Sequence, residues 1–576
     1  MTLALPAAAA VVALVGAGIA VSGSDSAEAG EGPSIGVDAS KPAEPSKDEL
    51  DKRVAEAMKA DVKSERSLVK QPDASVESAP SARIIGGSET TISTAPWMAQ
   101  LHFKDSTGAG YFCGGAVIAP TKVLTAAHCV KGIKWYETGT VVVGTDQLPT
   151  QNADGSVNYH GGQRVGAYRQ WNHPSYSPYT LDADVAVLTL TSAVSVKPLP
   201  LAQPTDGALY QAGLDGKVYG WGRTSSTNPN SASQTLKVAD ADIVSDTNCA
   251  AAYPDGFIKG HMLCAGAAPT GSDETSETTC NGDSGGPLVV SGRLVGIVSW
   301  GDENCSAVGK YGVYAKVSTY SAPVQARVDD ANWSSDHTAD LFARRTSDST
   351  MFNWYSKVSS LSRTENLGNW SGYTLALQND LDRDDYADVL TRYNGDVRWD
   401  HWAPSLNKWE SKLVATGWGK HKAILTPGDV TGDELPDLVT VDSVGTMRVY
   451  PGRGNGGFNA PVSVGTGWGK YTMVRGHGDF TNDGKADIFA RATDGKTYLY
   501  KGTGVATKPW SAPVLVAAFG SMNALATTGD VNSDGVADVL ARDTAGKLWL
   551  YPGNGKGGFL ARKDFGTGWQ AYNLFG

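Results

Sequence analysis

Three short motifs in the chain carry side chains that together can perform nucleophilic chemistry. Ser284 lies in the glycine-rich run Gly282–Pro287, His128 precedes Cys129, and Asp184 stands at the start of an apolar run. A serine hydroxyl is a weak nucleophile alone, and it becomes a strong one beside a general base and a site that stabilises an oxyanion. A histidine can take the serine proton, and an aspartate can hold that histidine in the right tautomer. The three motifs therefore predict acyl transfer through Ser284.

The backbone around Ser284 is predicted to supply the oxyanion site. Glycines on both sides allow a tight turn that points the N–H groups of Gly282 and Ser284 at one spot. A Gly-Asp-Ser-Gly run on its own is equally consistent with an ordinary surface turn. The order histidine, aspartate, serine along the chain favours catalysis, because it resembles the chymotrypsin–trypsin family of serine proteases over residues 84 to 328.

This resemblance implies a fold and a set of roles. The family has two six-stranded β-barrels with the site between them, and a helix over Tyr320 to Val328 would close the domain. His128 would act as general base and acid. Asp184 would orient it, because Asp-Val-Ala-Val-Leu after 184 matches the family better than the sequence after its rival Asp182. The strand Ser299-Trp300-Gly301 would line the substrate.

The cysteines indicate an oxidising environment. All six fall between Cys113 and Cys305, and no CxxC pair or paired histidine accompanies them, so a secreted disulfide-bonded domain fits better than a metal site. Spacing alone leaves 15 connectivities open. The family resemblance implies three pairs, which are Cys113–Cys129, Cys249–Cys264 and Cys280–Cys305.

The N-terminal residues 1–29 are predicted to be a secretory signal peptide, and the protein to be extracellular. Leu3 to Val21 is apolar, and Ala27-Glu28-Ala29 offers a cleavage site. No Lys or Arg precedes Lys41, so the basic start of such a signal is missing and an uncleaved anchor is the alternative.

Residues 30–83 are predicted to be a propeptide. Arg83 is followed by Ile84-Ile85-Gly86-Gly87. In the resembled family a cut before such an isoleucine frees an α-amine, which pairs with the aspartate before the catalytic serine, here Asp283. An activating protease that cuts after Arg83 is therefore expected. The alternative is a disordered linker, since Asp48 to Arg66 could form a short polar helix but carries too little apolar surface to bury a core.

The substrate pocket is predicted by position relative to Ser284. Thr278, six residues upstream, would form the base of the first specificity pocket, with Gly301 and Gly312 on its walls. An uncharged floor between glycines favours a large apolar or aromatic side chain. The alternative is a counter-charge for Arg or Lys, supplied by one of the nearby acidic residues Asp273, Glu274, Glu277, Asp302 and Glu303.

Beyond residue 329 the chain contains an internal repeat. Related pentapeptides that begin with aspartate recur at 340, 388, 437, 487 and 538, each followed by an aromatic strand. A period near fifty residues with several short strands per unit predicts the blades of a propeller. Residues 329–576 resemble FG-GAP/VCBS repeats and predict five blades. Tyr572–Phe575 matches the strand that opens each repeat and that the first repeat lacks, so it is predicted to close the ring.

Acidic loops precede four of these pentapeptides and are predicted to bind Ca²⁺. Oxygen donors at positions 1, 3, 5 and 9 of a tight loop converge on one point, which suits a hard cation. The alternative is that Asp, Asn and Gly simply form turns. The first repeat, with Asn332, Ser334, Asp336 and Asp340, carries less charge and is expected to be weak or empty. The predicted ligands are Asp380, Asp382, Asp384, Asp388, Asp429, Thr431, Asp433, Asp437, Asp479, Thr481, Asp483, Asp487, Asp530, Asn532, Asp534 and Asp538.

Composition narrows the class of protein. The chain has 576 residues, 68 glycines and a net charge of −11. This length predicts several domains, the glycines suit turn-rich all-β architecture, and the acidic balance argues against a nucleic-acid binder. Proteins or peptides are the expected substrates, and the repeats are expected to bind a surface polymer or glycan. The rival hypothesis is a catalytically inert protein that acts as an adhesion module through its repeats.

Overall fold

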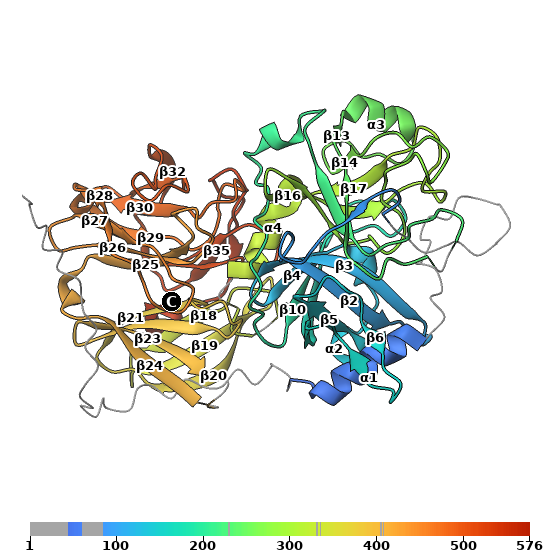
Figure 1. Cartoon of the computed structure of the whole chain (residues 1–576). Coiled ribbons are helices and arrows are strands. Elements are labelled where there is room, and N and C mark those ends of the chain that lie inside the picture. The colour runs from blue at the N-terminus through green and yellow to red at the C-terminus, as the bar shows by residue number, and fades with distance from the viewer. Residues whose placement is uncertain are drawn as a thin grey trace, which may run out of the picture.

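The computed structural model describes residues 44–59, 84–228, 231–329, 332–334, 336–403, 406 and 408–576. The predicted signal peptide and Arg83 lie outside these residues. The described chain forms two β-rich parts, a two-sheet unit over residues 84–329 and a five-bladed propeller over residues 332–576 (Figure 1). The helix α4, Val317–Asp329, lies between them. Within the described part of the chain, no helix is long and apolar enough to span a membrane.

The two-sheet unit consists of two antiparallel sheets. The first has seven strands in the order β8-β5-β2-β3-β4-β10-β9, and the second has eight in the order β1-β12-β11-β15-β16-β17-β14-β13. Short flanking strands bring both sheets above the six strands that the resemblance implies. The strands of the first sheet are β2 Met98–Lys104, β3 Gly110–Ala119, β4 Lys122–Thr125, β5 Thr140–Val143, β8 Gln163–Val165, β9 Ala167–Asn172 and β10 Ala186–Leu190. Those of the second are β1 Ser88–Glu89, β11 Lys217–Gly220, β12 Lys237–Asp240, β13 Ile243–Val244, β14 Met262–Ala265, β15 Pro287–Val290, β16 Arg293–Trp300 and β17 Gly312–Lys316.

Helices and disulfides hold the loops of this unit. Short helices are η1 Ala127–Cys129, α2 Trp135–Thr138, η2 Gly207–Tyr210 and α3 Asp246–Ala252, and a hairpin of β6 Thr150–Gln151 and β7 Val157–Asn158 stands outside the sheets. The closing helix predicted over 320–328 is α4. All three predicted disulfide pairs are present, and they are Cys113–Cys129, Cys249–Cys264 and Cys280–Cys305.

The segment predicted to lack a buried core contains a docked helix, and that part of the prediction is wrong. Helix α1 spans Lys47–Lys59 and buries Leu50, Val54 and Ala57 against the first sheet. Its start is capped by Ser46, whose hydroxyl accepts the backbone N–H of Glu49 at 3.2 Å. The three apolar residues are spaced four and then three residues apart, so they line up on one face of this charged helix. The average composition of the segment conceals this stripe.

The propeller has five four-stranded antiparallel sheets, as the repeat predicted. The C-terminal strand β37, Tyr572–Phe575, pairs with β18 of the first blade, so the predicted closure of the ring is confirmed. The strands of the blades are, in order, β37 with β18 Leu341–Arg345, β19 Thr350–Ser356 and β20 Leu361–Asn369; β21 Tyr373–Asn379, β22 Asp388–Tyr393, β23 Asp396–Ala403 and β24 Lys408–Ala415; β25 Ala423–Gly428, β26 Asp437–Val441, β27 Met447–Tyr450 and β28 Val462–Gly465; β29 Tyr471–Arg475, β30 Ile488–Ala492, β31 Lys496–Tyr500 and β32 Val514–Ala518; β33 Met522–Gly529, β34 Asp538–Asp543, β35 Leu548–Tyr551 and β36 Lys563–Asp564.

An arginine clamps four of the five joints between blades. It stands near the end of the second strand of its blade and donates from Nη1 to two backbone carbonyls at the start of the next blade. Arg491, for example, reaches the carbonyls of Phe519 at 3.2 Å and Met522 at 2.6 Å. Bonds from a charged donor are among the stronger hydrogen bonds in proteins. The other three clamps are Arg344 to Trp370 and Tyr373, Arg392 to Trp418 and His421, and Arg542 to Trp569 and Tyr572.

The joint between the third and fourth blades has no such arginine. Val441 stands where the other blades have Arg, and it lines a cavity together with Trp468 and Tyr471. This cavity of about 250 Å³ is also lined by Lys422. Lys422 donates instead to the carbonyl of Gly469, at 3.3 Å. The missing guanidinium accounts for the cavity.

Arg491→Leu is expected to lower the free energy of unfolding of the propeller by about 1–3 kcal/mol, because two carbonyls lose a charged donor. Val441→Arg is expected to have the opposite sign, because the cavity at its joint has room for the side chain. Differential scanning calorimetry of the full chain measures both. A propeller transition that is unchanged by Arg491→Leu would show that the clamps contribute little.

Candidate functional site

His128 and Asp184 lie together at the ends of two paired strands of the first sheet. His128 belongs to the short helix η1 after β4, and Asp184 lies just before β10, which pairs with β4. The Nδ1 atom of His128 is 2.8 Å from Oδ2 of Asp184, and the backbone N–H of His128 donates to Oδ1 at 2.8 Å. An ionised carboxylate can only accept. Nδ1 therefore carries the proton, and Nε2 is left as the basic nitrogen.

A third group on Asp184 was missed by the sequence analysis. The Ser299 hydroxyl donates to Oδ2 of Asp184 at 2.6 Å, so Ser299 contacts the carboxylate in addition to lying on the predicted substrate strand. The side chain of Asp184 is fully buried, and these three donors replace the water that it loses. Its rival Asp182 lies elsewhere and accepts from Nδ1 of His261 at 2.6 Å. Nothing in the sequence near Ser299 signals this bond, which joins the two sheets.

The loop of Ser284 is held against the segment that carries His128. The backbone N–H of Gly114 donates to the Ser284 carbonyl at 2.8 Å. Gly285 has φ +78°, and a Cβ there would lie only 2.1 Å from Oγ1 of Thr125, three residues before His128. Only glycine allows this approach. The glycines of the motif therefore bring the Ser284 loop close to the segment that carries His128. Ser284 itself is 5% exposed.

Asp283 fixes the turn in front of Ser284. Its fully buried carboxylate accepts the backbone N–H of Gly222 at 3.0 Å and that of Cys280 at 3.2 Å. Gly282, the other predicted oxyanion residue, has φ +97°, a conformation that favours glycine. The turn that would aim the N–H groups of Gly282 and Ser284 is thus set by one hydrogen bond from another loop, at Gly222, and one from Cys280 in its own loop.

The segment after the predicted cleavage point is inserted into the second sheet. Ile84 is fully buried in a cluster with Val218 and Leu288. Ile85 exchanges two backbone hydrogen bonds with Thr278, at 2.9 and 3.2 Å. A Cβ on Gly86 would lie 2.3 Å from a backbone carbonyl, so this insertion requires the glycine. The N-terminal segment therefore supports the predicted floor of the substrate pocket directly.

The residues predicted to form the substrate pocket differ in how tightly they are packed. Thr278 is buried, and its hydroxyl donates to the carbonyl of Thr279 at 3.2 Å. A Cβ on Gly312 would lie 2.6 Å from Oγ1 of Thr279, whereas one on Gly301 would meet no atom closer than 3.8 Å. Gly312 is thus tightly packed, and the wall at Gly301 is open.

The nearby acidic side chains have partners outside the pocket floor. Asp273 accepts from the backbone of Ser226 at 2.8 Å and from the hydroxyl of Ser306 at 2.7 Å. Glu277 accepts from the backbone of Asp240 at 2.8 Å. Asp302 accepts from the backbone of Asn304 within its own turn, and Glu274 and Glu303 are exposed. Within the described part of the chain, none of these hydrogen bonds joins a carboxylate to Thr278.

Each acidic loop of the propeller ends in a buried aspartate at position 9. The aspartate at position 9 is buried in all five blades. In four of them it accepts a backbone N–H group from its own loop and another from a later loop of the same blade. Asp437, for example, accepts from Val430 at 2.8 Å and from Gly452 at 2.9 Å. Burial raises the pKa of Asp437 to about 7. Position 9 therefore holds the blade together, whether or not a cation binds.

The loop at 380–388 differs from the others. The carboxylates of Asp380, Asp382 and Asp384 bring ligand oxygens within 4.8 Å of one another. Oδ1 of Asp382 and Oδ1 of Asp388 are buried and have no hydrogen-bond partner in the described structure, although Oδ2 of Asp388 accepts from Leu381 and from Trp399. Burial, and then the charge of Asp380, raise the pKa of Asp382 to about 7. The cluster of three carboxylates, with the orphaned oxygens of Asp382 and of the neighbouring Asp388, fits a hard cation.

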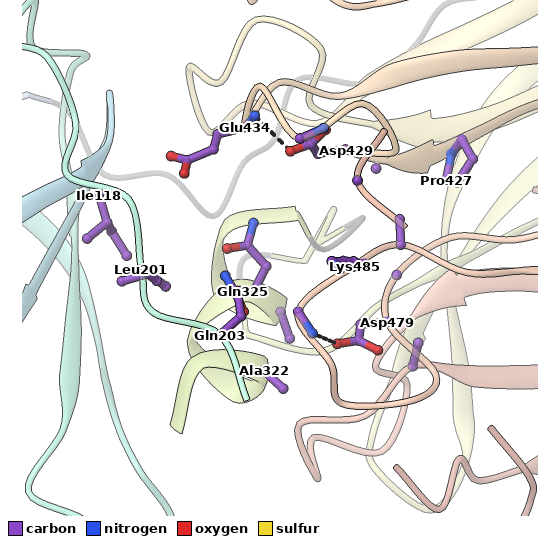
Figure 2. Close-up of a pocket in the computed structure, with 18 of the residues that line it drawn as sticks. Ile118, Leu201, Gln203, Ala322, Gln325, Pro427, Asp429, Glu434, Asp479 and Lys485 are labelled. Carbon is purple, nitrogen blue, oxygen red and sulfur yellow. Dashed lines mark hydrogen bonds between the residues drawn. The ribbon is translucent and has the colours of Figure 1, made fainter. Parts of the chain in front are cut away.

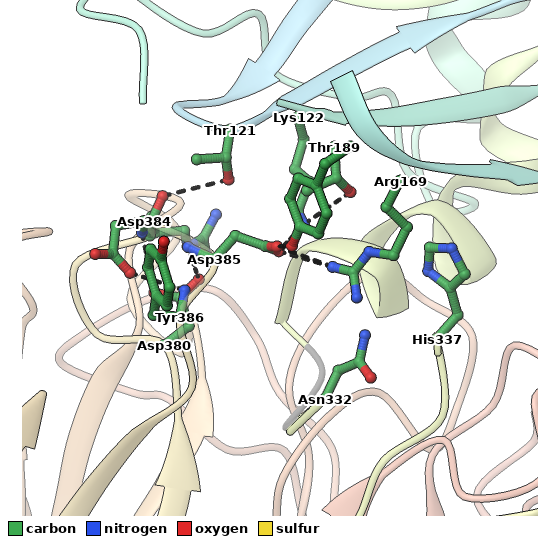
Figure 3. Close-up of polar contacts among 12 residues, drawn as sticks. Thr121, Lys122, Arg169, Thr189, Asn332, His337, Asp380, Asp384, Asp385 and Tyr386 are labelled. Carbon is green, nitrogen blue, oxygen red and sulfur yellow. Dashed lines mark hydrogen bonds and ion pairs between the residues drawn. The ribbon is translucent and has the colours of Figure 1, made fainter. Parts of the chain in front are cut away.

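The same face of the propeller packs on the two-sheet unit through a buried ion cluster. The carboxylate of Asp385 pairs with Lys122 and is 2.9 Å from Nη2 of Arg169, and the hydroxyl of Tyr168 donates to it (Figure 3). Burial lowers the pKa of Lys122 to about 8. Nη2 of Arg327, on α4, is 2.6 Å from Oδ2 of Asp530, the first position of the last loop. Both partners of this second pair are buried.

A cavity of about 300 Å³ lies between the two parts (Figure 2). Ile118, Leu201, Gln203 and Gln325 line it from the two-sheet unit. From the propeller come residues of the third and fourth loops, which include Asp429, Glu434, Asp479 and Lys485. The acidic loops therefore face the other half of the chain and not open solvent.

Asp385→Asn is expected to loosen the contact between the two parts, because Lys122 and Arg169 would remain buried without a counter-charge. Removing one partner of a buried ion pair costs about 3–5 kcal/mol. Calorimetry of the full chain should show the transitions of the two parts moving apart. Asp494→Asn is the control, since its pair with Lys496 is about half exposed and screened by water, so its loss should change stability little. Equal effects of the two substitutions would contradict the expectation.

Comparisons with known proteins match both parts of the chain. The family model described as Trypsin matches residues 84–324, and the one described as FG-GAP-like repeat matches residues 479–541. A trypsin of Saccharopolyspora erythraea is 35% identical over 237 residues, 41% of this chain and 94% of that protein. Cationic trypsin-3 of Rattus norvegicus is 35% identical over 247 residues, 43% of this chain and 90% of that protein. The solved structure of neuropsin, a serine protease expressed in the limbic system of mouse brain, has 31% identity, covers 42% of this chain and 99% of its own, and gives a TM-score of 0.35.

Proposed function

This chain belongs to the trypsin family of serine proteases through its two-sheet unit, and we propose that it is a secreted endopeptidase, made as a zymogen, whose catalytic residues are Ser284, His128 and Asp184. The observation that carries the assignment of the residues is the shared carboxylate of Asp184, which holds Nδ1 of His128 at 2.8 Å. The close packing of the Ser284 loop against Thr125 supports it. Proteins or peptides are the substrates.

In the proposed mechanism His128 takes the proton of the Ser284 hydroxyl as that oxygen attacks the substrate carbonyl. The N–H groups of Gly282 and Ser284 stabilise the oxyanion, each worth about 3 kcal/mol. His128 then protonates the leaving amine, and water hydrolyses the acyl-enzyme by the same route in reverse. Asp184 stabilises the imidazolium, and Ser299 keeps that carboxylate in place.

Ser284→Ala is expected to abolish peptide hydrolysis, because loss of the nucleophile costs about 10⁶-fold in kcat in this kind of site. The active form is expected to begin at Ile84, since the buried pair Ile84 and Ile85 supports the pocket and the α-amine would reach Asp283. Rates of peptide hydrolysis test the role of Ser284, and N-terminal sequencing of the active form tests the cleavage point. A variant with undiminished hydrolysis would exclude the catalytic assignment, and a different terminus would exclude the activation step.

The pocket is proposed to accept large apolar or aromatic side chains, with Thr278 at its base. The partners of Asp273, Glu277 and Asp302 support an uncharged floor. Such a pocket would cut poorly after Arg83, so maturation would need another protease with preference for arginine.

Peptides with Phe, Tyr or Leu before the scissile bond are expected to be cut at least about tenfold faster than matched peptides with Arg, because no counter-charge meets a guanidinium in the pocket. A peptide library with the mature enzyme measures this ratio. The precursor incubated alone should stay uncut, whereas a trace of trypsin should convert it. Prompt self-conversion would show that an acidic side chain reaches the pocket, and Asp273→Asn would then identify it.

Calcium is proposed to bind the acidic loops and to act structurally. The 380–388 loop is the strongest candidate, because it combines four carboxylates with the orphaned oxygens of Asp382 and Asp388. In the last loop Arg327 already pairs with Asp530, which reduces the attraction for a cation. The face of the propeller that turns away from the two-sheet unit is proposed to carry the enzyme to a surface polymer or glycan.

Chelation is expected to lower the melting temperature of the propeller in the full chain, and added Ca²⁺ to restore it, because a ligand of the folded form stabilises that form. Calcium must displace the proton of Asp382, whose pKa is raised to about 7, so binding should weaken from pH 8 to pH 6. Calorimetric titration measures affinity and pH dependence. Asp382→Asn should remove the tightest site, with Asp336→Asn in the first loop as the control. A titration without heat and a melting curve indifferent to chelator would leave these loops as ordinary turns.

A further inference from the structure

Strand β5 is apolar on both faces, although one face of a strand at the outside of a domain usually meets water. Val141 and Val143 point into the core of the two-sheet unit, and Val142 points to the other side, as alternation along a strand requires. Val142 is nevertheless fully buried, in a cluster with Tyr159 and with Val54 of helix α1. The helix therefore covers an apolar surface that belongs to the protease domain itself.

Polar contacts fix the helix along its whole length. Nη1 of Arg53, a residue only 9% exposed, donates to the carbonyl of Gly139 at 3.1 Å, and the hydroxyl of Thr140 donates to the carbonyl of Leu50 at 3.4 Å. Two ion pairs flank this buried centre. They are Asp51 with Arg164, and Glu56 with Lys104.

The residues just before the helix extend the contact. The hydroxyl of Ser192 donates to the carboxylate of Glu44 at 3.0 Å, and Pro45 packs on Gly166, where a Cβ would lie 3.1 Å from its ring. These contacts, like the main contacts of α1, lie on the first sheet, the hairpin of β6 and β7 and the loops beside them. The bound segment thus runs from Glu44 through the helix.

The proposed activation step takes place in the other sheet. Ile84 packs among residues of the second sheet, and Ile85 pairs with Thr278. The helix and Ile84 are separated by residues 60–83. A cut before Ile84 therefore breaks no contact of the helix, and the rearrangement of the new terminus occurs away from it.

We propose that α1 stays bound after this cut, so that the mature enzyme is a complex of two chains, the protease with its propeller and a short non-covalent pro-chain. This inference rests on the proposed cleavage before Ile84. The pro-chain is then a permanent cover of β5 and not a released activation peptide.

The experiment uses a full-length precursor in which residues 79–83 are replaced by Asp-Asp-Asp-Asp-Lys, so that enteropeptidase cuts before Ile84 and spares the lysines and arginines of the helix. The cut protein is passed over a gel-filtration column in 0.5 M NaCl, and each fraction is analysed by mass spectrometry and N-terminal sequencing. The fragment that contains residues 47–59 is expected to elute with the Ile84 chain.

Val54→Asp places a charge in the buried cluster and is expected to reduce the co-eluting fragment at least about tenfold. Met58→Asp adds the same charge at an exposed position of the helix, and the fragment is expected to stay bound. If Val54→Asp prevents folding of the precursor, the elution of the unsubstituted fragment still decides the question.

The outcomes separate this inference from the proposed function. An active Ile84 chain whose fragment elutes alone would overturn the two-chain mature enzyme and leave activation intact. An Ile84 chain without activity would overturn the proposed activation, while co-elution would still report whether the helix holds. Co-elution that Val54→Asp and Met58→Asp reduce equally would show that the apolar contact with β5 does not bind the helix.

Discussion

Buried carboxylates that accept backbone N–H groups fix the conformation of the loops around the catalytic motifs and in the propeller blades. Burying a charged oxygen is costly unless several donors surround it, so such a residue fixes the chain segments that supply them. Asp184 holds His128, and Asp283 joins Gly222 and Cys280 in front of Ser284. The aspartate at position 9 does the same in four of the five blades, as Asp437 does between Val430 and Gly452. The two halves thus share one structural device despite unrelated folds.

The same chemistry, with side-chain cations as donors, joins the halves. Asp385 meets Lys122 and Arg169, and Asp530 meets Arg327. Because both clusters are buried, salt screens them little, and they hold the propeller in one orientation relative to the catalytic sheets. A propeller fixed in this way presents its far face in a constant direction, so a ligand bound there would also determine how the cleft of the protease approaches that surface.

Much of this architecture could be predicted from the sequence, because it depends on local patterns. The motifs around His128 and Ser284, the spacing of the repeats and the strand Tyr572–Phe575 are all local signals, and the family resemblance supplied the disulfide pairs. What the sequence could not predict depends on partners distant in the chain. The bond from Ser299 to Asp184 and the ion cluster at Asp385 join separate sheets or domains. The short polar helix was anticipated from the sequence, but its docking was not, because only three of its side chains are buried and their partners lie around β5.

The closing strand of the propeller also has a consequence for the order of events during synthesis. The first blade is completed by β37, whose neighbour Gly576 exchanges backbone hydrogen bonds with Phe342. These residues follow all five repeats in the sequence, so the ring cannot close until translation has passed through all of them. The catalytic sheets, encoded earlier, contain all their own strands and can assemble first. A ribosome that stalls late would therefore release a finished protease half attached to an open ring with an exposed strand edge.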